Sequence, residues 1–88
     1  MSTAVWASGP ATITEVIHCN ANGGTVVYEL SDGTYAFVYD TTDEFSKNLQ
    51  AQMTAAWLTG KTIVSYMYGT AVSNCGVWAS ILTSVTMQ

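Results

Sequence analysis

The sequence is poor in charge. Of its 88 residues only 9% are charged, with two basic against six acidic side chains, no arginine and a net charge of −4. An average soluble protein carries about 25% of these residues. Nucleic-acid binding depends on clustered Lys and Arg that neutralise phosphates, so two lysines, Lys47 and Lys61, exclude this class. Disorder is excluded as well, because 49% of the residues are hydrophobic and few are charged.

Long apolar runs are missing too. No stretch of about 18 consecutive apolar residues exists, so no membrane insertion is expected. The segment from Met1 to Trp6 lacks the basic, apolar and small-residue regions of a signal peptide. We therefore expect a soluble protein, cytoplasmic as written, or secreted if the chain is a mature form that has lost its signal peptide.

Cysteine and histidine are scarce. Cys19 and Cys75 are the only cysteines; they are too few for a disulfide scaffold and permit a single bridge, whose formation depends on the redox compartment. His18, the only histidine, adjoins Cys19 in a run of strand character, where neighbouring side chains point to opposite faces. The sequence thus offers no metal site, no catalytic residues and no cofactor motif, and it predicts a protein that is not an enzyme.

What the sequence does contain is a series of short β-type runs around one helical run. β-Branched and aromatic residues dominate the former, while apolar residues recur at spacings of three and four in the latter. No linker or repeat interrupts them, so residues 1–88 are expected to form a single domain. The predicted elements are an N-terminal arm at 1–10, strands at 12–19, 25–30 and 34–40, a helix ending at Gly60, strands at 61–68 and 77–87, and a loop at 69–76.

Turn and cap residues set these boundaries. Asp32-Gly33 between two alternating runs is a strong hairpin signal. Thr41 with Glu44 three residues later fits a capping box, which places Thr41 at the N-cap of the helix. Gly60 fits the residue just past the helix, where positive φ is needed.

Aromatic residues are the remaining candidates for core or ligand contacts. Tyr35, Phe37 and Tyr39 fall on one face of a strand, where they either pack or form a platform on which a ligand stacks. Trp57 lies on the apolar helix stripe and is expected in the core, whereas Trp78 should face away from the interior. Alternation on the last strand puts the odd-numbered apolar residues of 77–87 on its inner side.

The order of elements is that of an OB-fold, a five-stranded Greek-key barrel with a helix between its third and fourth strands. The predicted fold class is therefore mainly β with one helix (α+β), in a small five-stranded OB-fold-like barrel. In that barrel the loop after the first strand and the loop between the last two lie at the same end and form the usual binding face. Cys19 and Cys75 fall in or beside these loops, so a disulfide between them is geometrically reasonable in an oxidising environment.

The chain also resembles the small B subunits of bacterial pentameric toxins, in the branch of subtilase cytotoxin and pertussis-like toxins. The matching residues are the Asp32-Gly33 hairpin, the segment AAWLTGKTIV at 55–64, and Cys75 shortly before ASIL at 79–82. The resemblance covers residues 13–87. It implies barrels assembled into a ring whose helices line a central pore, with shallow sites for sialylated or other cell-surface glycans.

Three functions from different classes fit this sequence. The first is a homo-oligomeric glycan-binding module, with Ser8, Tyr66, Tyr68 and Trp78 as ligand-binding candidates chosen by loop position and exposure. The second is a structural barrel, or one that binds a protein partner; the third is a barrel that binds a small molecule. All three predict self-association, because the β edges hold few of the Lys, Pro or inward charges that usually protect them.

Overall fold

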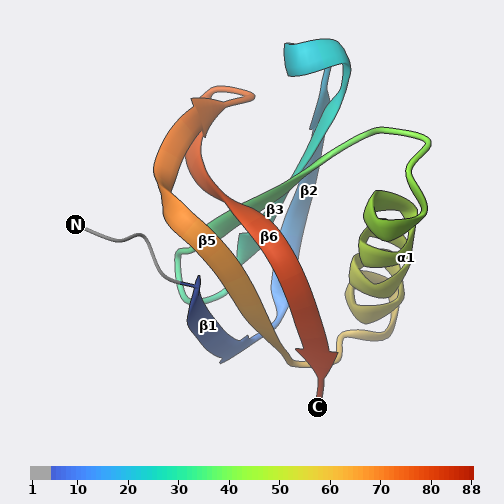
Figure 1. Ribbon diagram of the computed structural model, residues 1–88. Helices are drawn as coiled ribbons and strands as arrows, with labels where there is room; N and C mark the ends of the chain where they lie inside the picture. The colour runs from blue at the N-terminus through green and yellow to red at the C-terminus, as the bar shows by residue number, and fades with distance from the viewer. Residues whose placement is uncertain (1–4) are drawn as a thin grey trace.

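Six strands and one helix make up the fold. The computed structural model describes residues 5–88, and its strands are arranged in one sheet with the helix beside it (Figure 1). The fold class is therefore α+β and mostly strand, as the sequence predicts. The elements are β1 Val5–Ala11, β2 Ile13–Cys19, a 3-10 turn η1 Ala21–Gly23, β3 Thr25–Leu30, β4 Tyr35–Tyr39, α1 Glu44–Thr59, β5 Ile63–Asn74 and β6 Val77–Met87.

The first strand takes the place of the predicted arm at 1–10, of which residues 1–4 lie outside the described part of the chain. β1 pairs antiparallel with β5, with Ser8 opposite Ser65 and a register shift just after Ser8. Pro10 has no N–H to donate and lies in this irregular stretch, which is where sheets tolerate proline. The prediction of five strands is wrong for this reason: the chain on both sides of Pro10 is paired.

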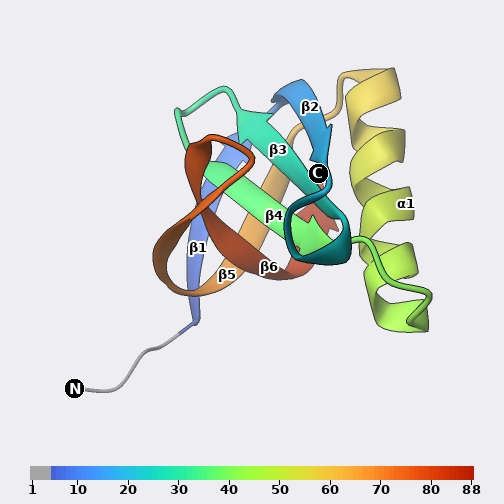
Figure 2. The same ribbon diagram turned by 90° about the horizontal axis from the view of Figure 1, so that it is seen from above.

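The sheet curls so that its two outer strands are neighbours in the chain. The hydrogen-bonded order is β1-β5-β6-β4-β3-β2, and every pair is antiparallel except β4 with β6. Thr12 alone separates β1 from β2, so the ends of this order are joined covalently at Thr12. Seen from above, the strands cross one another beside α1 (Figure 2). This curl brings the β3–β4 turn close to β1.

The hairpin of β5 and β6 is longer than predicted, because residues 69–76 do not form a loop. β5 continues to Asn74, which pairs with Val77. Between them, Cys75 and Gly76 have φ of 53° and 82°. Positive φ at both central residues is the geometry of a type I′ turn, which suits the twist of a hairpin. Cysteine is not a residue that usually favours such a turn, so Gly76 is the only residue of the pair that indicates it in the sequence.

The main core lies on the concave side of the sheet and is closed by α1. The even-numbered apolar residues of β3 point into it, and α1 contributes Leu49, Met53 and Ala56. The apolar stripe of the helix is shorter than predicted. Phe45 and Trp57 lie at its ends, and Trp57 is 44% exposed rather than in the core. The buried members are Ala11, Ile13, Val26, Tyr28, Leu30, Ala36, Val38, Leu49, Met53, Ala56, Ile63, Met67 and Leu82.

The helix is capped two residues later than the sequence predicts. Asp43 is the N-cap, and its carboxylate accepts a hydrogen bond from the Ser46 N–H at 3.1 Å. Thr41, the predicted N-cap, instead accepts from the Asp43 N–H at 3.3 Å. Aspartate is as good an N-cap as threonine or better, and Asp43 is the residue that reaches an unpaired helical N–H. Gly60 ends the helix with φ of 70°, as predicted.

A second apolar cluster covers the outer side of the sheet. Val27, Phe37 and Ala79 are buried there, on the strand faces that point away from the main core. The ring of Phe37 meets that of Tyr39 edge to face, with centroids 5.3 Å apart. The aromatic row of β4 thus packs at Phe37, while Tyr39 keeps part of its ring in solvent.

β6 changes face at Thr83. The register of β5 and β6 shifts there, which leaves Thr83 as an extra residue whose hydroxyl donates to the Tyr66 carbonyl at 2.9 Å. Such a bulge reverses the alternation of side chains that follow it. Ala79, before the bulge, packs in the outer cluster, whereas Val85, after it, packs against the main core. The prediction of one inner face along 77–87 is wrong because of this single residue.

Candidate functional site

A cluster of hydroxyl and carboxylate groups lies where β1 passes the β3–β4 turn. The Ser8 hydroxyl donates to Asp32 Oδ2 at 2.5 Å and lies 2.9 Å from Thr34 Oγ1. The Thr34 N–H donates to Asp32 Oδ1 at 3.0 Å. Ser8 is only 8% exposed, whereas Asp32 is open to solvent. We call Ser8, Asp32 and Thr34 the Ser8 cluster.

The turn that carries Asp32 is fixed on the sheet by backbone hydrogen bonds. The Gly33 N–H donates to the Leu30 carbonyl at 2.9 Å, and φ of Gly33 is 90°, a conformation that glycine adopts at low cost. Ser31 is bonded to Thr12 in both directions. Its N–H donates to the Thr12 carbonyl at 2.8 Å, and its hydroxyl accepts from the Thr12 N–H at 3.0 Å. The turn therefore holds Asp32 in a defined place beside β1.

The cluster carries negative charge. Desolvation works to raise the pKa of Asp32, but hydrogen bonds from Ser8 and Thr34 outweigh it, and the pKa lies below its ordinary value. Asp32 is therefore ionised at neutral pH. The two lysines of the chain belong to other elements: Lys47 is in α1 and Lys61 follows it. Neither β1 nor the β3–β4 turn supplies a basic side chain.

Trp6 adds an aromatic surface next to the cluster. It precedes Ser8 by two residues on β1, so both side chains lie on the same face of the strand. The indole N–H donates to the Gly69 carbonyl at 2.9 Å, which fixes the ring, and Trp6 remains 39% exposed. A carboxylate, two hydroxyls and a fixed, partly open indole ring can hydrogen-bond a polyol and stack on its carbon face.

Ser65 is the cross-strand neighbour of Ser8 and shares its face. Its side chain is 0% exposed, and its hydroxyl has no hydrogen-bond partner among the described residues. An unsatisfied buried hydroxyl costs free energy. The pair thus combines one hydrogen-bonded hydroxyl, on Ser8, and one hydroxyl without a partner among the described residues, on Ser65.

The four predicted ligand-binding residues are not brought together. Ser8 belongs to the cluster, but Tyr66 and Tyr68 pair with Ala7 and Val5, the residues whose side chains alternate with that of Ser8. The tyrosines therefore lie on the other face of β1 and β5. Their phenols do not point toward the Ser8 hydroxyl.

Trp78 is also separate from the cluster. It pairs with Ser73 near the end of the β5–β6 hairpin and faces solvent, as its position in the strand predicts. The residues that sequence reasoning missed are Asp32, Thr34 and Trp6. The position of Asp32 in a hairpin turn already explained why an aspartate is there. No sequence pattern links it to Ser8, which is 24 residues away.

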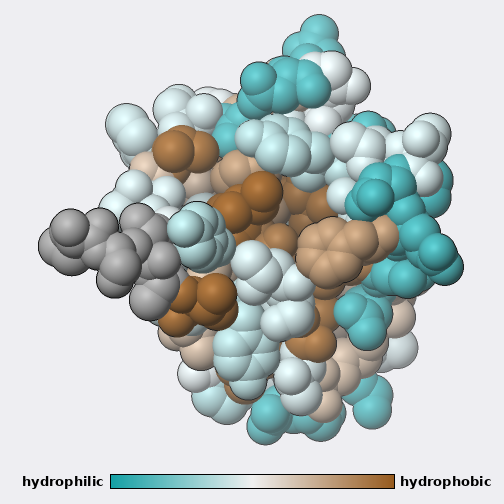
Figure 3. Space-filling view, in the orientation of Figure 1, coloured by the Kyte–Doolittle hydropathy of each residue, from teal (hydrophilic) through white to brown (hydrophobic). Residues whose placement is uncertain are grey.

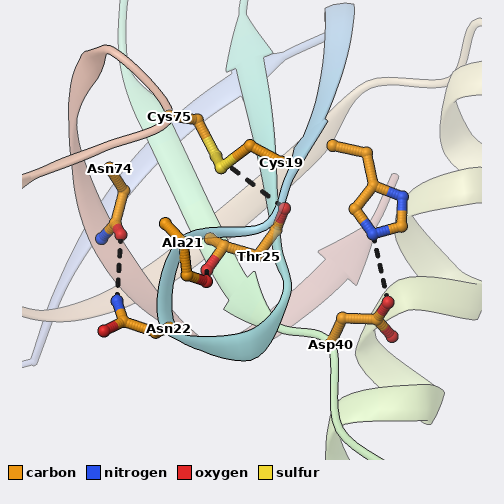
Figure 4. The surroundings of a disulfide bond; sticks show 8 residues. Cys19, Ala21, Asn22, Thr25, Asp40, Asn74 and Cys75 are labelled. Atoms are coloured by element: carbon orange, nitrogen blue, oxygen red, sulfur yellow. Dashed lines mark hydrogen bonds and ion pairs between the residues drawn. A yellow bond between two sulfur atoms is a disulfide. The ribbon is translucent and has the colours of Figure 1, made fainter.

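The structure joins Cys19 and Cys75 in a disulfide that ties β2 to the tip of the β5–β6 hairpin. Their Cα atoms are 5.7 Å apart. Figure 4 shows a second link beside it, in which the Asn22 side-chain amide donates to Asn74 Oδ1 at 3.4 Å. The hairpin tip is therefore attached both to β2 and to the η1 turn, which holds the hairpin against the outer apolar cluster.

Within the described part of the chain, other polar groups form no comparable site. His18 contacts Asp40 at 3.1 Å, and both side chains are exposed. Residues 5–88 hold no group of three His, Cys, Asp or Glu side chains placed to bind a metal ion. A shallow depression on the solvent side of α1 is lined by that element alone: Lys47, Gln50, Ala51, Thr54, Ala55 and Leu58.

The surface is as weakly charged as the composition requires. In Figure 3 pale and brown residues cover the middle of the visible face, and the strongly hydrophilic ones lie around its edge, at the top, along the side where α1 lies and at the bottom. Pale colours mark residues near the middle of the hydropathy scale, such as Ser, Thr, Tyr and Trp. The middle of this face is therefore formed mainly by residues of intermediate or apolar hydropathy.

None of the family models, curated proteins or solved structures compared with the chain matches it. No helix within residues 5–88 has the length and hydropathy to cross a membrane.

Proposed function

We propose that this chain is a non-enzymatic, self-associating barrel of OB-fold type that binds glycans at the Ser8 cluster and Trp6. The observation that carries the proposal is the bonded set of Ser8, Asp32 and Thr34 beside a fixed indole ring. Sugars present hydroxyl groups around a ring with a carbon face. Hydroxyl donors to a carboxylate form strong hydrogen bonds, and an aromatic ring accommodates the carbon face.

The OB-fold assignment is supported by the strand order. If β1 and β2 are two halves of one first strand, bent at Thr12, the fold has five strands in Greek-key arrangement with a helix before the fourth. The bent strand then pairs with β3 through one half and with β5 through the other. The parallel pairing of β4 with β6 links the β2-β3-β4 part of the sheet to the β1-β5-β6 part.

The experiment is a glycan array probed with the purified protein, followed by two matched variants. Trp6 and Trp78 are both exposed tryptophans on strands, but only Trp6 adjoins the Ser8 cluster. We expect Trp6→Ala to lose most of the binding to any glycan that the array identifies, because stacking area is removed. Trp78→Ala should retain it. No binding above background at high protein concentration contradicts the proposal, and loss of binding only in Trp78→Ala moves the site to the hairpin.

A second candidate is a barrel whose main contacts are with protein. Apolar side chains exposed on α1 and on the β5–β6 hairpin favour it, because open apolar surface usually marks a contact area. Leu58 is the most exposed of them at 75%. Co-purification of a stoichiometric partner, without glycan binding, would favour this function over the first.

A further inference from the structure

We infer that the Ser8 cluster selects neutral glycans over acidic ones, such as those that end in sialic acid or sulfate. This rests on the proposed function and adds the substrate class. The inference follows from the kind of hydrogen-bonding groups in the cluster and from the position of the basic residues in the fold.

The cluster offers mainly acceptors. The Asp32 carboxylate accepts from the Ser8 hydroxyl through Oδ2 and from the Thr34 N–H through Oδ1. An ionised carboxylate only accepts hydrogen bonds, and Asp32 is open to solvent, so a ligand that bonds to it must donate. The hydroxyls of Ser8 and Thr34 also accept. A ligand that satisfies these atoms must donate, which is what an unmodified sugar hydroxyl does and what a carboxylate or sulfate group does not.

Neither β1 nor the β3–β4 turn carries a basic side chain that could offset a negative ligand. Proteins bind carboxylate and sulfate groups with Arg or Lys, and this chain has no arginine. Its lysines, Lys47 and Lys61, lie within α1 and between α1 and β5. An acidic sugar at the cluster would therefore meet the Asp32 charge and the net charge of −4 without compensation. Repulsion at about 4 Å near a protein surface weakens binding by tenfold or more.

The test compares matched oligosaccharides that differ only in a terminal sialic acid or sulfate, by calorimetry with the wild-type protein. We expect the neutral member to bind about tenfold more tightly at low salt. The difference should narrow as NaCl rises, because salt screens exposed charges. Equal or tighter binding of the acidic member overturns the inference while leaving glycan binding intact. Failure to bind either member overturns the proposed function itself.

Two variants locate the source of the preference. Asp32→Asn keeps the shape of the side chain and removes its charge, so the ratio of neutral to acidic binding should fall toward one. Ser8→Ala weakens both ligands but keeps the charge, so the ratio should persist. Circular dichroism shows whether each variant is folded, and the salt series on the wild type decides the question if Asp32→Asn is not. An unchanged ratio in folded Asp32→Asn contradicts the role given to this carboxylate.

Discussion

At the scale of single residues, Ser8 and Ser65 have the same side chain but differ in whether its hydroxyl has a hydrogen-bond partner. Ser8 donates to Asp32 and meets Thr34, while Ser65, directly across the strand pair, has a buried hydroxyl without a partner. The first hydroxyl stabilises the fold and the second costs it free energy, because a buried polar group that leaves water must find a hydrogen bond. Only the tertiary contacts distinguish them.

Alanine substitution should therefore have opposite effects at these two positions. Ser8→Ala removes a hydrogen bond to a carboxylate and should lower the free energy of unfolding by about 1–2 kcal/mol. Ser65→Ala removes an unsatisfied buried hydroxyl and should raise it by about 1 kcal/mol. Urea denaturation of the two variants beside the wild type measures both. A loss of stability in Ser65→Ala would show that its hydroxyl has a partner.

At the scale of secondary-structure elements, α1 depends on one side chain at its start. Asp43 satisfies the Ser46 N–H, and Thr41 satisfies only the N–H of Asp43, outside the helix. We expect Asp43→Ala to lower the free energy of unfolding by about 1 kcal/mol. Thr41→Ala, the matched control, should change it by less than about 0.5 kcal/mol. Thermal unfolding followed by circular dichroism compares the stability of the two variants. A larger loss of stability in Thr41→Ala than in Asp43→Ala supports the capping box at Thr41.

The β5–β6 hairpin depends on the disulfide. Cys19 and Cys75 are separated by 56 residues, and a loop of this length gives about 4 kcal/mol of stabilisation as an upper figure. Reduction should lower the urea midpoint, because this stabilisation is lost. It should also release the hairpin tip from β2, so that Phe37 in the outer cluster becomes more exposed to solvent. The double variant Cys19→Ser and Cys75→Ser is the control. It should match the reduced protein and show no response to reductant; equal midpoints with and without reductant in the wild type mean that the bond is not formed.

At the scale of the whole molecule, the prominent property is a surface with little charge and several exposed apolar side chains. Leu58 and Trp78 are among the most open of these, on α1 and on β6. A surface of this kind is more stable when a second copy covers part of it. We therefore expect static light scattering at tens of micromolar to give a mass of more than one chain. A mass of one chain at that concentration contradicts self-association.

The sequence predicts the strands and the helix correctly where the hydrophobic periodicity and the turn or cap residues agree. Asp32-Gly33 identified the turn between β3 and β4, and Gly60 identified the end of α1, because these signals depend on neighbours in the chain. The prediction failed where a distant strand decides the structure. Residues Val5–Ala11 form β1 because they pair with β5. The side chains of β6 change face at Thr83 because the register between β5 and β6 shifts there.

The candidate site shows the same division. The sequence singled out Ser8, but the partners of its hydroxyl, Asp32 and Thr34, come from a turn whose local signal described only a hairpin. Tyr66 and Tyr68 were ligand-binding candidates together with Ser8, yet pairing of β1 with β5 places them on the other face. Which face of a strand carries a side chain relative to another strand is fixed by register, and register is a property of the pair.

The sequence by itself determined the α+β class and a composition with few charges, in which two lysines and no arginine are too few for nucleic-acid binding. These conclusions follow from composition and from periods of two and 3.6 residues, which are local quantities. The tertiary structure alone decided that β1 closes against β5 and that a carboxylate meets the Ser8 hydroxyl. The physical reason is that hydrogen bonds between residues distant in sequence form only after the sheet has curled and set its register.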